Sequence, residues 1–286
     1  MVERSPNIRE RRLVTEIKKA RDAAGLTLVE VNKRLGWSIS MLSRIETHKR
    51  RVKIGELAEL LDLYGVKGEH RERLLSLARS SRETGWWDTY AGALSTELTN
   101  YLSLEAEASG LECYEAMVFH GLLQTPEYAE RVIRSGLMSL APPQEVTRRV
   151  EVRMNRQEIL SRDEPFSLWT VIDESVLERV IGGPKVMRTQ LLSVAELAQR
   201  PNVTVQVLYT RPEAHPALSG TFSIMKFPGR YDTDVVYLET MTGSLYAEDE
   251  SHVHRYNLAF NQLRAIALGP DESVELIVNR AEQLKE

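Results

Sequence analysis

Hydrophobic residues recur at helical spacing near the start of the chain, and shorter strand-like runs appear in its second half. The first pattern predicts five helices, at about 8–24, 28–35, 39–46, 54–65 and 68–82. Further helices are predicted at 91–104, from Pro126 onward, and at 143–162, 184–199, 251–268 and 271–284. Runs rich in β-branched and aromatic residues predict strands at 166–172, 203–209, 221–227 and 235–239. Residues 105–114 fit either state, with a strand favoured after about Ala106.

These elements predict an α+β protein of two domains. Residues 1–83 would form a five-helix domain, and residues 84–286 a mixed α/β domain with a sheet of about four or five strands. Small and charged residues at 80–85 predict the joint between them. Trp86 and Trp87 follow directly, and adjacent indoles at a boundary are expected to seal the two domains together and to serve as a hinge.

The stretch from Thr27 to Glu46 holds two short helical patterns that meet at Gly36. Thr27 has the spacing of a capping box with Glu30, and glycine readily adopts the left-handed backbone of a turn. The second helix would turn Leu42 and Ile45 inward. Its outward face then consists of Ile39, Ser40, Met41, Ser43 and Arg44. Such a face suits the DNA major groove, because arginine can pair with guanine and apolar tips can contact a thymine methyl group.

Charge is distributed unevenly along the chain. Residues 1–82 contain 19 Lys and Arg against 11 Asp and Glu, a net charge of +8, whereas the rest carries −12. A basic module on an acidic protein is expected where that module alone must contact phosphates. The residues expected to contact the DNA backbone are Thr27, Lys33, Arg34, Ser38, Lys49, Arg50, Arg51 and Lys53.

The first domain resembles the helix-turn-helix of the lambda-repressor/Cro-like (Xre) family. The matching segments are AGLTL at 24–28, RLGWS at 34–38 and SRIE at 43–46. The resemblance implies that Ile39, Ser40 and Arg44 read bases and that Arg21 pairs with Glu46. Two positions depart from the family pattern, since Leu28 replaces a DNA-contacting glutamine and Asn32 replaces an alanine between the two helices.

The whole chain resembles the actinobacterial WhiJ-like regulators, which are also described as antitoxin-like. The shared blocks are GWW at 85–87, LEAEAS at 104–109, GLLQTPEYA at 121–129, RQEIL at 156–160, GGP at 182–184, RPNVTVQVL at 200–208 and DVVYLET at 234–240. The resemblance implies a transcription factor whose second domain receives a signal. In some members that signal is a small acidic partner protein encoded by an adjacent gene.

Composition narrows the classes of protein further. No apolar run approaches the roughly 18 residues of a membrane span, and the N-terminus lacks the apolar segment of a signal peptide, so we expect a cytoplasmic protein. Cys113 is the single cysteine, which excludes an internal disulfide and a multi-cysteine zinc site. We expect no metal and no cofactor.

Two functional hypotheses follow. The favoured one is a DNA-binding regulator, not an enzyme, that binds an inverted-repeat operator as a homodimer. The alternative is a hydrolase-like enzyme targeted to DNA by its first domain. The alternative has few candidate residues, since His252 and His254 point apart on a helix and His120 and His215 lie alone on loops. The acidic pair Asp173 and Glu174, and residues 248–250, are more simply solvated.

Overall fold

The structure is a computed structural model that describes residues 8–80, 85–90, 94–138, 140–163, 166–209, 214–228 and 233–284. The chain divides into two compact units, Met1–Asp88 and Thr89–Glu286. Three predicted features lie partly or wholly outside the described residues: most of the joint at 80–85, the end of the fifth helix at 81–82, and residues 91–93 of the next helix. Within the described ranges, no helix is both long and apolar enough to cross a membrane.

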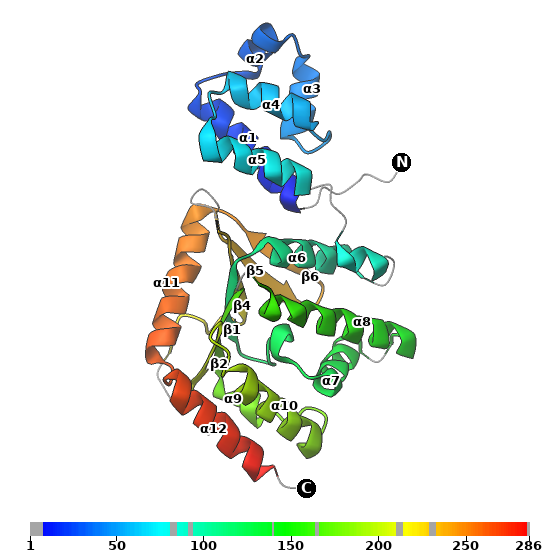
Figure 1. Ribbon diagram of the computed structural model, residues 1–286, viewed down its shortest axis with the longest axis vertical. Helices are drawn as coiled ribbons and strands as arrows, with labels where there is room; N and C mark the ends of the chain where they lie inside the picture. Colours follow the sequence, from blue (N-terminus) through cyan, green and yellow to red (C-terminus); the bar gives the residue numbers. More distant parts are fainter. Residues whose placement is uncertain are drawn as a thin grey trace. The chain divides into compact units, whose positions relative to one another are not determined.

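The first unit consists of five helices (Figure 1). They are α1 (Ile8–Ala23), α2 (Leu28–Leu35), α3 (Ile39–Glu46), α4 (Ile54–Leu63) and α5 (Gly68–Ser80). Each helix turns its apolar stripe toward a common core, in which Ile17, Val31, Ile45, Leu57 and Leu74 are almost completely buried. A 3-10 helix, η1 (Trp86–Tyr90), follows this bundle.

The second unit contains a six-stranded sheet in the order β3-β2-β1-β4-β5-β6. Its strands are β1 (Gly110–Glu115), β2 (Ser167–Asp173), β3 (Val203–Leu208), β4 (Phe222–Lys226), β5 (Val235–Thr240) and β6 (Gly243–Ala247). β1, β2 and β3 are parallel, whereas β4, β5 and β6 are antiparallel to their neighbours. β1 therefore lies where the parallel half meets the antiparallel half.

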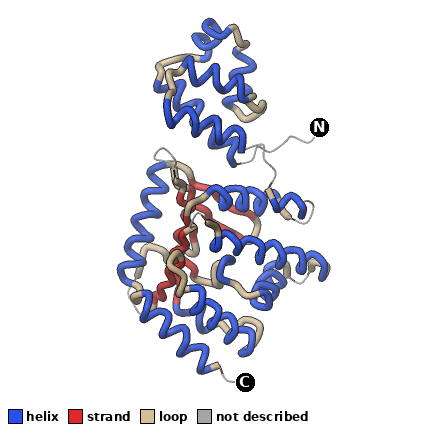
Figure 2. The backbone as a smooth tube through the Cα atoms, viewed as in Figure 1, coloured by secondary structure: helices blue, strands red, loops and turns tan. Residues whose placement is uncertain are grey.

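Helices lie on both faces of this sheet (Figures 1 and 2). The helices of the second unit are α6 (Thr96–Glu107), α7 (Pro126–Gly136), α8 (Pro143–Arg156), α9 (Glu174–Glu178), α10 (Pro184–Leu197), α11 (Glu250–Ile266) and α12 (Pro270–Gln283), with 3-10 turns η2 (Gly121–Leu123) and η3 (Gln157–Ser161). α11 packs on the face that carries Tyr114, Val171 and Ile224. α6 and α8 lie on the opposite face.

The α+β class predicted from the sequence is confirmed, with three corrections. The sheet has six strands, because β6 is a short, half-exposed partner of β5 that the apolar pattern did not reveal. α6 continues to Glu107, so β1 begins later than predicted, at Gly110. α8 ends at Arg156 instead of about residue 162, and η3 continues the chain from there.

Candidate nucleic-acid interface

Local hydrogen bonds fix the turn between α2 and α3. The Thr27 hydroxyl accepts from the Glu30 amide at 3.3 Å, and the Thr27 amide donates to the Glu30 carboxylate at 2.7 Å. This capping box starts α2. Gly36 ends α2 with φ 71°, a conformation that favours glycine. The Asn32 side chain donates to the backbone carbonyl of Trp37, so it ties the end of α2 to the start of α3.

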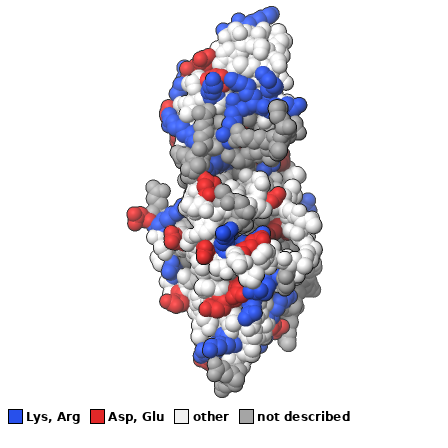
Figure 3. Space-filling view, turned by 90° about the vertical axis from the view of Figure 1, so that its right-hand side faces the viewer, with Lys and Arg blue, Asp and Glu red and all other residues white. Residues whose placement is uncertain are grey.

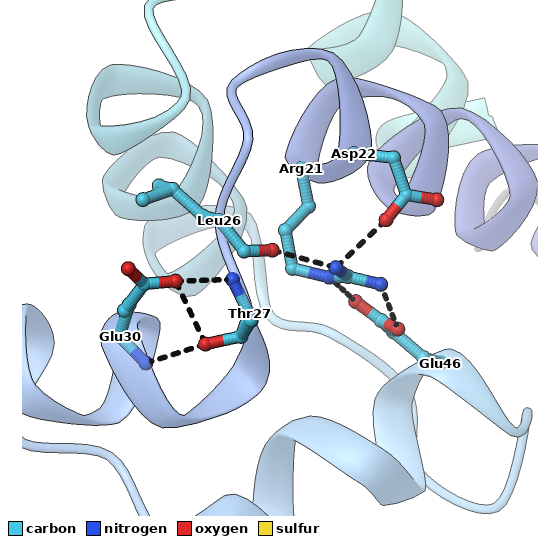
Figure 4. A network of polar contacts seen from close by, with 6 residues as sticks. All are labelled: Arg21, Asp22, Leu26, Thr27, Glu30 and Glu46. Carbon is cyan, nitrogen blue, oxygen red and sulfur yellow. Dashed lines mark hydrogen bonds and ion pairs between the residues drawn. The ribbon is translucent and has the colours of Figure 1, made fainter.

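An ion pair anchors the far end of α3 (Figure 4). The Arg21 guanidinium donates to the Glu46 carboxylate through Nε at 2.7 Å and Nη2 at 3.0 Å. Its Nη1 donates to the Leu26 carbonyl at 2.7 Å and pairs with Asp22. The hydrogen bond to Glu46 raises the pKa of Arg21, although burial opposes it. α1, the α1–α2 loop and α3 are thereby held in one geometry.

α3 has a buried face and an open face. Leu42 and Ile45 are buried in the core of the first unit. On the open face, Ile39 is 44% exposed, and Ser40 and Arg44 are also exposed. The helix begins at Ser38, whose hydroxyl accepts from the Met41 amide at 3.2 Å. Residues that can meet base edges therefore lie on one rigid, capped helix.

Two residues expected on that open face are only partly available. Met41 is half-buried and packs against the core, and Ser43 is half-buried. Both lie at the borders between the buried and the open face of α3, so neither side chain is fully buried or fully exposed. The exposed reading face is thus narrower than predicted and centres on Ile39, Ser40 and Arg44.

The candidate phosphate contacts fall into two groups. Lys33, Arg34, Lys49 and Lys53 are exposed, and no residue in the described part of the chain forms an ion pair with them. Thr27 and Ser38 are also exposed, but their side chains serve as helix caps. Figure 3 shows Lys and Arg side chains gathered on the face of the first unit turned to the viewer.

Arg50 and Arg51 form the second group, because each has a carboxylate partner. Arg50 donates to both oxygens of Glu56, at 2.9 and 2.7 Å, and this pairing raises its pKa. Arg51 pairs through Nε with Glu10. The charges of these two arginines are therefore balanced within the protein, which the spacing of basic residues along the sequence does not reveal.

A further candidate residue was missed in the sequence. Val29 lies in the first turn of α2 and is 47% exposed, although it is large and apolar. Its neighbour Leu28 is half-buried and packs against the core. The sequence could have revealed Val29, because it is an apolar residue that lies outside the buried stripe of α2, one position before the half-buried Glu30.

The two tryptophans predicted at the domain joint lie on η1, just before the division between the units. Trp87 is buried and Trp86 is half-buried, with their rings edge to face at a centroid distance of 5.8 Å. A Cβ added at Gly85 would overlap the indole ring of Trp87, so the GWW segment needs glycine at that position. This close approach explains the glycine without a ligand.

The residues considered as candidates for a catalytic site lie on different elements of the second unit. Asp173 caps α9, since its carboxylate accepts from the Ser175 amide at 3.0 Å. His252 and His254 are both on α11, and His120 is buried in η2's entry turn. Among the described residues, no group of three or more His, Cys, Asp or Glu could hold a metal ion.

Comparison with known families distinguishes the same two parts of the chain. Residues 12–74 match the model described as Helix-turn-helix domain, which supports a DNA-binding regulator. Residues 98–279 match the model described as Domain of unknown function (DUF5753). No curated protein and no solved structure matches the chain significantly.

Proposed function

Because the chain belongs to the family described as Domain of unknown function (DUF5753) and carries a helix-turn-helix domain before it, we propose that it is a sequence-specific transcriptional regulator. The observation that carries this proposal is the open face of α3, where Ile39, Ser40 and Arg44 project from a capped and anchored helix. Exposed cations beside this face would hold the phosphates, and the base-reading side chains would select the sequence.

The proposed mode of action is occupancy of an operator. Two subunits joined through their second units would place two copies of α3 about 34 Å apart, one helical turn of DNA. The operator would then be an inverted repeat. Control would come through the second unit, from a small partner protein or another ligand, in the manner of the WhiJ-like and antitoxin-like regulators that the sequence resembles. Such an effector releases DNA only if it binds one arrangement of the two units better than the other.

The test of base reading is Arg44→Ala. Removing the guanidinium should weaken binding to the specific site by about 1–3 kcal/mol and relax the preference at one base pair. Fluorescence anisotropy on the operator, and on variants changed at single base pairs, measures both effects. Lys67→Ala is a matched control, because Lys67 is an exposed cation between α4 and α5. An equal loss on operator and random DNA would show that Arg44 contacts only phosphate.

The two groups of cations lead to a second prediction. Lys49→Ala should reduce the slope of log affinity against log salt by about 0.9, because an unpaired cation at the interface displaces one counterion. Arg50→Ala should change the slope much less, since Glu56 already balances this arginine. Binding titrations at several salt concentrations compare the two neighbours directly. Equal changes in slope would remove the distinction between the groups.

We propose binding, not catalysis, as the role of the second unit. Asp173, one of the few carboxylates positioned after a parallel strand, is occupied in capping α9. A screen of the full chain for hydrolysis of ester, amide and phosphoester substrates tests this proposal. Turnover that disappears in a Glu115→Gln variant, whose substitution lies at the end of β1, would favour the enzyme alternative.

A further inference from the structure

The sheet face beneath α6 and α8 carries a row of polar side chains. Strand pairing aligns Thr170, Cys113, Ser223 and Tyr237 across β2, β1, β4 and β5. Thr170, Cys113 and Ser223 are buried, and the residues that alternate with this row belong to the apolar core on the α11 face. A sheet face covered by helices is normally apolar, because burying polar groups costs free energy.

A buried ion pair lies over this row. Arg156 of α8 donates to both oxygens of Glu105 on α6, at 2.9 and 2.8 Å. Its guanidinium stacks 4.8 Å from the ring centre of Tyr101, and Tyr101 contacts Tyr237 of the sheet with ring centres 4.6 Å apart. Burial lowers the pKa of Arg156, but Glu105 more than compensates, so the net shift is upward. This arginine is fully neutralised by the fold.

Arg153 lies one helical turn before Arg156 and is not neutralised. Its Nη1 donates to the side-chain oxygen of Gln124 at 2.8 Å, and no carboxylate in the described ranges lies within ion-pair distance of it. The side chain is half-buried. Burial and the charge of Arg156 lower its pKa to about 10, although Glu239, Tyr101 and Glu105 act in the opposite direction. A partly desolvated guanidinium beside a second cation is unfavourable unless an anion joins it.

The segment from Gly121 to Gln124 forms a fixed wall beside the two arginines. A Cβ added at Gly121 would lie 3.2 Å from Nη1 of Arg156 and 3.7 Å from Nε of Arg153. Gln157 donates to the carbonyls of both Gly121 and Gln124, at 3.1 and 2.6 Å. The glutamine side chain that faces Arg153 is held as well, because it donates to the Phe119 carbonyl at 2.6 Å. The Arg153 guanidinium is thus oriented in advance of any ligand.

Glu115 supplies a carboxyl group on the same face of the sheet, which can complement the Arg153 guanidinium. It ends β1 on the same face as Cys113 and is buried. Burial, together with the charge of Glu239, raises its pKa to about 8, and Arg153 opposes this shift. A raised pKa favours the protonated carboxyl, which can donate a hydrogen bond to an oxygen atom. Glu239 itself is exposed at the end of β5.

We propose that Arg153, Gln124 and Glu115, on the α6 and α8 side of the sheet, form a binding site for a small molecule that carries an anionic group. The arginine fork would bind the two oxygens of a carboxylate or phosphate. Figure 3 shows basic and acidic side chains meeting beside a hollow in the second unit. This proposal goes beyond DNA binding and does not depend on it.

The test is a titration of the 15N-labelled full chain with inorganic phosphate and, separately, with succinate, each against chloride at equal ionic strength. We expect saturable changes in the Arg153 Nε–Hε resonance and in the backbone amides of residues 121–124. Arg153→Gln should abolish these changes. Arg149→Gln should retain them, because Arg149, one turn earlier on the same helix, is already paired with Glu145 at 2.7 Å.

The outcomes separate the possible ligands. Saturation by phosphate alone indicates a phosphate ester, by succinate alone an organic acid, and by both a site that recognises the oxyanion in either form. Changes that never saturate, or that persist in Arg153→Gln, would overturn the proposal. If Arg153→Gln does not fold, Arg153→Lys replaces it: the lysine keeps the charge but lacks the fork, so affinity should fall several-fold, and unchanged affinity would overturn the site. The titration contains no DNA, so its failure leaves the regulator proposal intact.

Discussion

Glu105→Ala is expected to destabilise the second unit by about 3–5 kcal/mol, the largest effect of any single substitution considered for this protein. Glu105 is 3% exposed and Arg156 is 8% exposed. Removing the carboxylate would leave Arg156 buried beside Arg153, and among the described residues neither guanidinium would have a carboxylate within ion-pair distance. The free-energy loss reflects the stranded charge more than the lost attraction.

Hydrogen–deuterium exchange measures this loss in the second unit alone, because the slowest amides of β1 and β2 report its global opening. Glu97→Ala is the matched control, since it removes an exposed carboxylate from the first turn of the same helix and should cost less than about 1 kcal/mol. Glu105→Leu combined with Arg156→Met should recover most of the stability. A loss no greater than that of the control would mean that water still reaches the pair.

Glu115 is expected to make the protein less stable as the pH rises. Its pKa in the folded state is about 8, well above its ordinary value of 4.5, so the folded state holds a proton that the unfolded state has released. The stabilisation that Glu115 contributes is fully present below pH 4.5. It decreases by about 1.4 kcal/mol per pH unit between pH 4.5 and about pH 8. His120 has the opposite effect below pH 6.5, because burial and then Arg156 and Arg153 lower its pKa.

The two effects oppose each other below pH 6.5, so the clear window lies above it. Between pH 6.5 and pH 8, wild type should lose about 2 kcal/mol that Glu115→Gln keeps. Urea denaturation of both proteins at the two pH values measures the difference, and contributions from the first unit cancel. Glu151→Gln, at an exposed position on α8, should behave as wild type. Parallel loss in wild type and Glu115→Gln would show that Glu115 is already ionised at pH 6.5.

The first unit was largely predictable because its signals are local. Thr27 with Glu30, the glycine at position 36, and the spacing of Leu42 and Ile45 each act within one or two helical turns. The carboxylate partners of Arg50 and Arg51 were harder to predict from the sequence. Glu56 is six residues away across a loop, and Glu10 lies on another helix, so neither pairing follows from helical spacing.

The second unit was predictable only in outline. Its strands are short, and β1 pairs with both β2 and β4, which lie far apart in the sequence. The row from Thr170 to Tyr237 exists only once the strand order is known. The sequence also places Glu105 and Arg156 in separate blocks, 51 residues apart, and their contact depends on how α6 and α8 pack together.

The pairing of Arg50 with Glu56, and of Arg51 with Glu10, bears on how such a protein would search a genome. Every free cation strengthens attachment to any duplex, whatever its sequence, and a chromosome offers millions of irrelevant positions. Because Arg50 and Arg51 are already paired within the protein, they would add less to nonspecific affinity for DNA. The protein would then dissociate sooner from irrelevant sites, and base selection by α3 would be unchanged. Discrimination by α3 would then count for more, and fewer molecules would be sequestered far from their target.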